Sequence, residues 1–123
     1  MDRFKIAASS LFLILLLPAA SFAGEADVIG ASARKIGPGI YWIAAKVRHA
    51  DSGWDHYADR WEVLIGDEII AARVLAHPHV DEQPFTRSMG GVEIPSGVTQ
   101  VTIRAHDKVH GYGGQTFELA LPK

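Results

Sequence analysis

Polar and apolar side chains alternate along several short stretches of the chain, and alternation with a period of two predicts β-strands. The clearest stretch is residues 99–106, in which Val101, Ile103 and Ala105 alternate with polar residues. Turns that contain glycine or proline, such as GPG at residues 37–39, separate these stretches. We therefore expect no helix after residue 23 and strands at residues 26–36, 40–49, 59–65, 68–76, 88–94, 99–106 and 115–121.

Short strands with turns at this spacing predict an antiparallel β-sandwich. Trp61 shares one face of the third expected strand with Val63 and Ile65. A buried tryptophan at that place resembles the immunoglobulin-like and fibronectin-like arrangement, and the segment IPSGVTQVTIRAHD resembles the corner and sixth strand of such domains. We therefore expect an all-β fold, an immunoglobulin/fibronectin-like antiparallel β-sandwich of about seven strands, formed by residues 24–123 as a single domain. This resemblance implies a fold class and no function.

The first 23 residues have the pattern of a secretory signal peptide. Arg3 and Lys5 supply positive charge, residues 7–17 form an apolar run, and Ser21 and Ala23 place small residues at the −3 and −1 positions of a cleavage site. The uninterrupted run is only about half of the ~20 residues that a membrane-spanning helix needs. We expect cleavage after Ala23, a mature chain without a transmembrane segment, and a periplasmic or secreted location.

Charge and composition narrow the possible functions. Without Asp2, Arg3 and Lys5, the chain has 13 acidic and 10 basic residues, a net charge of −3 with neutral histidines. This mildly acidic balance argues against a nucleic-acid partner, which would require a basic patch. The 123 residues contain no cysteine, which excludes disulfides, thiol catalysis, cysteine–zinc sites, blue-copper sites and a lipid anchor through a cysteine.

Three long connections, at residues 50–58, 77–87 and 107–114, alternate with three short turns. If successive strands run up and down, alternate connections share an end of the sandwich, so the three long ones lie together. The loops at one end of such a scaffold commonly carry its function. The six histidines fall in these connections or at the adjoining strand ends: His49, His56, His77, His79, His106 and His110.

Imidazole and carboxylate side chains together can bind a transition metal, so we expect a copper or zinc ion at this end. Pro78 favours an extended chain, in which its two neighbouring histidines project to the same side. His49 is expected only to end a strand. The expected ligands are His77, His79 and His106 first, then His110 and His56. The side chains expected to orient these ligands or to contact the bound species are Asp55, Asp81, Glu82, Asp107, Trp54 and Tyr112.

Carriage, buffering or sensing of the metal is the expected role. The alternative is a metal-free recognition module that binds an exported protein or an envelope component through the same histidine and aromatic loops. A small metal-dependent enzyme is a third interpretation. The sequence does not indicate a serine hydrolase, because no serine lies in a Gly-x-Ser-x-Gly elbow. Because a domain of this size is more often a binder, we do not expect an enzyme.

Four charged side chains on the expected sheet are interpreted as stabilising the fold. If the third, fourth and sixth strands are neighbours, Glu62 lies between Arg104 and Arg73, with Arg60 on the same face. This arrangement predicts a cross-strand ladder of ion pairs. Capture of an anion by the arginines is the alternative.

Overall fold

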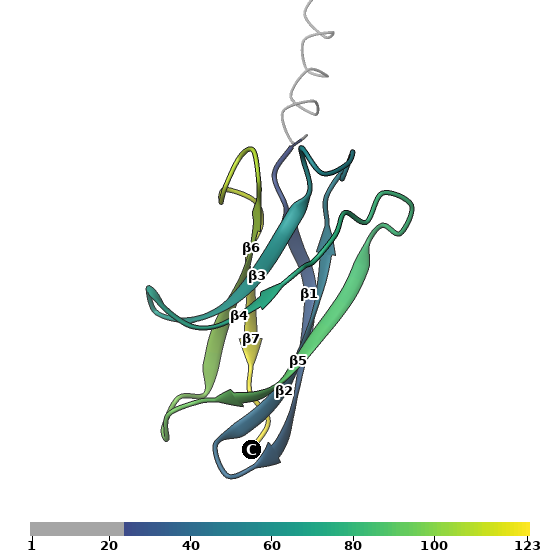
Figure 1. The fold of residues 1–123 in the computed structure, drawn as a ribbon. Helices are drawn as coiled ribbons and strands as arrows, with labels where there is room; N and C mark the ends of the chain where they lie inside the picture. The colour runs from purple at the N-terminus through teal and green to yellow at the C-terminus, as the bar shows by residue number, and fades with distance from the viewer. Residues whose placement is uncertain (1–23) are drawn as a thin grey trace, which may run out of the picture.

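The computed structural model describes residues 24–123, which form seven β-strands (Figure 1). The expected signal peptide, residues 1–23, lies outside the described residues. All seven expected strands are confirmed, with ends that differ by a few residues. The strands are β1 (Asp27–Gly37), β2 (Ile40–Arg48), β3 (Ala58–Ile65), β4 (Glu68–Val74), β5 (Phe85–Glu93), β6 (Gln100–Asp107) and β7 (Phe117–Ala120).

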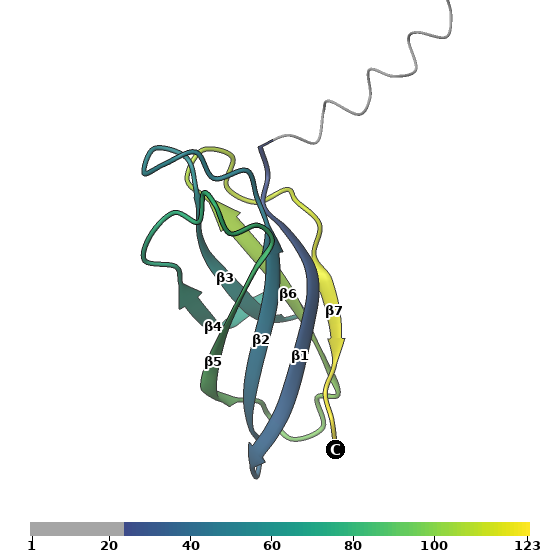
Figure 2. The same ribbon diagram turned by 90° about the vertical axis from the view of Figure 1, so that its right-hand side faces the viewer.

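The strands form two antiparallel sheets that pack as a β-sandwich, as the sequence predicts. One sheet has the order β1-β2-β5 and the other β4-β3-β6-β7. Figure 2 shows β2 between its neighbours β1 and β5, with β3 and β6 in the layer behind them. A bulge in β5 at Gly90 and Gly91 lies opposite Trp42, and Gly91 has a φ of 68°, which glycine adopts without strain.

Apolar side chains from the inner faces of both sheets form the core. Trp61 and Phe85, at 0% and 1% exposure, are its largest members. Ile43 on β2 and Ile103 on β6 are also fully buried. Because these side chains belong to both sheets, their burial holds the two layers together and favours folding by about 25 cal/mol per Å² of apolar surface removed from water. No helix in residues 24–123 is long and apolar enough to cross a membrane.

The predicted ion pair between Glu62 and Arg104 is confirmed, whereas the predicted position of Arg73 is wrong. Nε of Arg104 and Nε of Arg60 donate to the Glu62 carboxylate at 2.7 and 2.8 Å. A register shift in the β3–β4 pair places Arg73 opposite Trp61, on the inner side of the sheet. Its Nε therefore donates to the carbonyl oxygen of Ser88 on β5, at 2.8 Å, and links the edges of the two sheets.

The three long connections meet at one end of the sandwich, and the β1–β2 and β5–β6 turns lie at the other (Figures 1 and 2). Hydrogen bonds join the long connections to one another. The backbone N–H of His79 donates to Asp51 Oδ2 at 2.7 Å, which links the β4–β5 loop to the β2–β3 loop. The N–H of Lys108 donates to the carbonyl oxygen of Tyr57 at 3.1 Å, which links the β6–β7 loop to the β2–β3 loop.

Candidate metal centre

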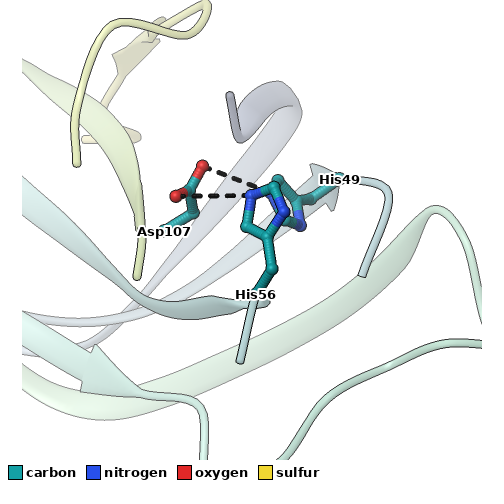
Figure 3. Close-up of side chains that lie close together, drawn as sticks. All are labelled: His49, His56 and Asp107. Carbon is teal, nitrogen blue, oxygen red and sulfur yellow. Dashed lines mark ion pairs between the residues drawn. The ribbon is translucent and has the colours of Figure 1, made fainter. Parts of the chain in front are cut away.

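Three residues at this end bring potential metal ligands together. The ligand atoms of His49, His56 and Asp107 all lie within 4.8 Å of one another. His49 directly follows β2, His56 lies in the β2–β3 loop, and Asp107 is the last residue of β6. Figure 3 shows the two rings beside the Asp107 carboxylate. Three separate segments therefore converge on one point.

A tight turn after β6 positions Asp107. Its Oδ1 accepts the backbone N–H groups of Val109 and His110, at 2.7 and 2.5 Å, which is typical of an aspartate that begins a turn. The turn closes with paired backbone hydrogen bonds between Asp107 and Gly111. The carboxylate is fully buried. Burial favours the protonated acid, but the N–H donors of His110 and Val109 outweigh it and hold the pKa of Asp107 below its ordinary value.

Asp51 fixes the ring of His49. Nδ1 of His49 and Oδ1 of Asp51 form a short hydrogen bond between two fully buried side chains. Asp51 also accepts the backbone N–H of Ala58 at 3.1 Å and that of His79 at 2.7 Å. A carboxylate held in this way accepts only, so Nδ1 of His49 carries the hydrogen. In a neutral ring Nε2 then holds the lone pair, whereas in a protonated ring Nε2 also carries a hydrogen.

Nε2 of His49 faces two oxygen atoms. Nε2 lies 2.9 Å from the carbonyl oxygen of Gly24 and 3.2 Å from Oδ2 of Asp107. Both oxygens are acceptors. Three groups of lone pairs at these distances repel one another unless a cation, either a proton or a metal ion, lies among them.

His56 adds a fourth residue with potential ligand atoms. Its Nε2 lies 3.3 Å from the carbonyl oxygen of Gly24 and 3.7 Å from Oδ1 of Asp107. Tetrahedral zinc with bonds of about 2.0–2.1 Å to nitrogen and oxygen places neighbouring ligand atoms about 3.3 Å apart. Four contacts among His49, His56, Asp107 and Gly24, at 2.9–3.7 Å, lie around that value, although the two histidines face different oxygens of Asp107. One ligand atom from each of His49, His56 and Asp107 lies within 4.8 Å of the others.

His110 lies at the edge of this group. Its Nδ1 is 3.2 Å from Oδ2 of Asp107, and its ring centroid is 4.9 Å from that of His56. Its ring also packs against the backbone of Gly24, where an added Cβ would come within 2.5 Å of Cε1. Of the expected ligands, the structure therefore brings His56 and His110 together with Asp107.

His77 and His79 have a different environment. The ring of His79 is buried and stacks on Phe85 with 4.0 Å between centroids, and the ring centroid of His77 lies 4.7 Å from that of His79. Burial, followed by the charge of Arg87, lowers the pKa of His79. Gln83, in the same loop, accepts the backbone N–H of His49 and donates to the carbonyl oxygen of His79. In the described structure the loop supports Asp51 and His49 from outside the candidate centre.

His106 and Tyr112 belong to the polar face of the β4-β3-β6-β7 sheet. His106 Nδ1 pairs with Asp59 at 2.6 Å. The hydroxyl of Tyr112 donates to Glu62 and accepts from Arg60, both at 2.8 Å, and Arg104 lies 3.8 Å from its ring centroid.

The remaining expected side chains lie nearer the solvent. Glu82 pairs with Arg87 at 3.0 Å, and Asp55 and Asp81 are exposed. Trp54 is 64% exposed and makes an edge contact with Tyr57. None of these contacts belongs to the group around His49, and the assignment of His77, His79 and His106 as ligands stays a prediction.

Two members of the arrangement have no role in the site expected from the sequence. His49 is expected only to end a strand, and Asp51 is not among the residues expected to orient a ligand. Their spacing, a histidine and an aspartate two residues apart just after a strand, was the available signal. Its meaning depends on His56 and Asp107, which are close to His49 only in the folded chain.

Among known proteins, the chain is similar to a protein of Halomicrobium mukohataei named "Putative lipoprotein". It is 42% identical over 93 residues, which is 74% of this chain and 45% of that protein. No protein-family model matches the chain. No solved structure shows significant similarity to it. The chain thus spans less than half the length of the relative, and it is similar to one part of a longer protein.

Proposed function

We propose that this chain is an exported β-sandwich protein that binds a copper or zinc ion through His49, His56 and Asp107, with the carbonyl oxygen of Gly24 beside them. The observation that carries the proposal is the position of His49 Nε2, which faces the oxygens of Gly24 and Asp107 at 2.9 and 3.2 Å. Two imidazoles and a carboxylate are a donor set that suits Zn(II) and Cu(II).

The buried charges support the same proposal. Asp51 and Asp107 are two buried carboxylates, and their ion-pair partners are histidines. Buried charges are usually paired or coordinate a metal. A divalent cation would balance both carboxylates. The bond between Asp51 and Nδ1 of His49 would orient the ring, as carboxylates commonly do for metal-bound histidines.

Export and fold type are further parts of the proposal. The name of the Halomicrobium mukohataei relative supports an exported, envelope-associated protein. The 123 residues contain no cysteine, so a lipid on a cysteine is not available to this sequence. The strand orders β1-β2-β5 and β4-β3-β6-β7, with Trp61 buried on β3, support the expected immunoglobulin/fibronectin-like type of sandwich. Carriage, buffering or sensing of the metal would suit a small protein of this kind.

Metal analysis and titration test the proposal. Protein purified without an affinity tag should contain or take up about one equivalent of copper or zinc per chain. His56→Ala should weaken binding about tenfold or more, the scale seen when groups around metal sites are lost. His77→Ala is the matched control, because His77 is exposed and contacts the carbonyl oxygen of Pro78. The metal affinity of His77→Ala should equal that of the unmodified protein.

Two results would contradict the proposal. Less than about a tenth of an equivalent of metal in the purified protein, with no uptake on titration, would refute metal binding. Loss of affinity in His77→Ala with normal affinity in His56→Ala would move the site to the ligands first expected from the sequence.

A metal-free recognition module is the second candidate, and the exposed apolar residues favour it. Trp54, Val80 and Val109 are 64%, 52% and 58% exposed. Each lies on a different one of the three long loops. Exposed apolar groups gathered at one end of a domain are typical of a partner-binding surface. Capture of the same partner by metal-free and metal-loaded protein, and its loss in Trp54→Ala, would support this function.

A further inference from the structure

The backbone of Gly24 is enclosed by three histidines. Its carbonyl oxygen lies 2.9 Å from Nε2 of His49 and 3.3 Å from Nε2 of His56. A Cβ atom at Gly24 would lie 2.5 Å from Cε1 of His110, a separation that real Cβ atoms do not have. Gly24 therefore lies within the candidate centre, and a larger residue at this position would displace the ring of His110.

The same residue follows the cleavage site expected from the sequence. Cleavage after Ala23 would convert the amide nitrogen of Gly24 into a free α-amino group. An amide nitrogen shares its lone pair with the carbonyl group, so it cannot serve as a ligand without losing its proton. An α-amino group has an ordinary pKa of about 7.7–8.0, and its neutral form has a free lone pair.

We infer that removal of the signal peptide completes the metal centre, because the new α-amino group of Gly24 becomes a ligand. This inference rests on the proposed function. The α-amino nitrogen is bonded to the same Cα as the carbonyl carbon, so nitrogen and oxygen of Gly24 can hold one metal ion in a five-membered ring. His49, His56 and Asp107 supply the other ligands. Binding releases the proton of the amine, as it does for other titratable ligands.

One consequence concerns where in the cell the protein acquires its metal. The precursor presents an amide nitrogen at Gly24 and lacks the amine ligand. The processed chain presents the complete set. The processed protein would then bind its metal more tightly than the precursor, which favours metal uptake after export and cleavage.

Moving the amino group tests this inference. The full chain is exported with its own signal, either unchanged or with one alanine inserted between Ala23 and Gly24, and mass spectrometry establishes the first residue of each product. The insertion moves the amino group by about 3.8 Å along the chain, while His49, His56 and the carbonyl group of Gly24 remain. We expect the unchanged product to begin at Gly24 and to bind Cu(II) or Zn(II) at least about tenfold more tightly than the extended product.

A second measurement does not depend on affinity. In the unchanged product, bound Zn(II) should protect the α-amino group of Gly24 from an amine-reactive reagent, while lysine side chains react as before. Equal affinity of the two products, an unprotected amine, or a product that begins at another residue would overturn the inference and leave the proposed function standing. Failure of both products to bind Cu(II) and Zn(II) would refute both.

Discussion

Asp51 forms a hydrogen bond with Nδ1 of His49 inside the protein. The Asp51 carboxylate also accepts hydrogen bonds from the backbone N–H groups of Ala58 and His79, which fix its position. Both side chains are fully buried. This relationship decides which nitrogen of His49 is available, since a carboxylate that accepts from Nδ1–H leaves Nε2 as the lone-pair nitrogen. The direction in which His49 can bind a metal is therefore set by a residue that would not touch the metal.

Replacing this carboxylate by an amide should weaken metal binding. In Asp51→Asn the amide nitrogen faces a group that itself donates a hydrogen bond, so one buried donor loses its partner. We expect metal affinity to fall about 10–100-fold and the free energy of unfolding to fall by about 2–3 kcal/mol. Competition titration and urea denaturation measure the two effects. Asp55→Asn is the control, because Asp55 is exposed in the same loop. A folded Asp51→Asn protein with unchanged affinity would contradict this account of His49.

His79 should make the protein less stable in mild acid. Both ring nitrogens are buried without a hydrogen-bond partner among the described residues. Burial, followed by the charge of Arg87, lowers the pKa of His79. The folded protein then binds fewer protons than the unfolded chain below the ordinary histidine pKa of about 6.5, so stability falls as the pH drops through that window.

His79→Phe removes the titrating ring and keeps the stacking on Phe85. We expect this variant to lose less stability than the unmodified protein between pH 7 and pH 5, measured by urea denaturation at each pH. His77→Phe is the control. It removes only a minor contribution to the lowered pKa of His79 and should keep most of the pH dependence. Metal affinity should be retained in His79→Phe. A tenfold loss of affinity would instead identify His79 as a ligand, as the sequence first indicated.

Glu62 should stabilise the fold at neutral pH and lose this effect in acid. Burial of its carboxylate opposes ionisation, but hydrogen bonds from Arg60 and Arg104 hold the pKa of Glu62 below its ordinary value. A lowered carboxyl pKa gives stability that is fully present above the unfolded-state value, about 4.3, and is lost as the pH falls through the lower folded-state value.

Glu62→Gln should therefore lower the free energy of unfolding by about 2 kcal/mol at pH 7, since hydrogen bonds to a charged group are lost. The difference from the unmodified protein should shrink below about pH 4. Glu118→Gln is the control, because Glu118 is exposed and its partners are Gln100 and Thr102. A difference that stays constant from pH 7 to pH 3 would show that the charge of Glu62 is not the source of the effect.

Truncation of two tryptophans to alanine should change the stability of the protein by very different amounts. Trp61 is 0% exposed and Trp54 is 64% exposed. We expect Trp61→Ala to cost about 3–5 kcal/mol, because it removes the largest side chain of the core. Trp54→Ala should change stability by no more than about 0.5 kcal/mol. Thermal and denaturant unfolding measure both, and a large loss of stability in Trp54→Ala would show that Trp54 packs against the domain instead of facing solvent.

The strands and turns could be predicted from the sequence because they depend on local rules. Alternation in residues 99–106 and the turn at residues 37–39 are visible without a structure. The pairing of Glu62 with Arg104 followed from the expected order of strands and is confirmed. The position of Arg73 could not be predicted in this way, because one bulge between β3 and β4 moves every later residue of β4 to the opposite face.

The sequence by itself determined the class of fold, the end of the sandwich that holds the histidines, and the kinds of side chain present there. Only the tertiary structure decided which histidines meet. His49, His56 and Asp107 lie in three segments, and their ligand atoms come within 4.8 Å because the turn after β6 and the loop after β2 fold onto the same point. Strand periodicity fixes which face a side chain points to. It does not fix the path of a loop, which depends on buried hydrogen bonds such as those that Asp51 accepts from Ala58 and His79.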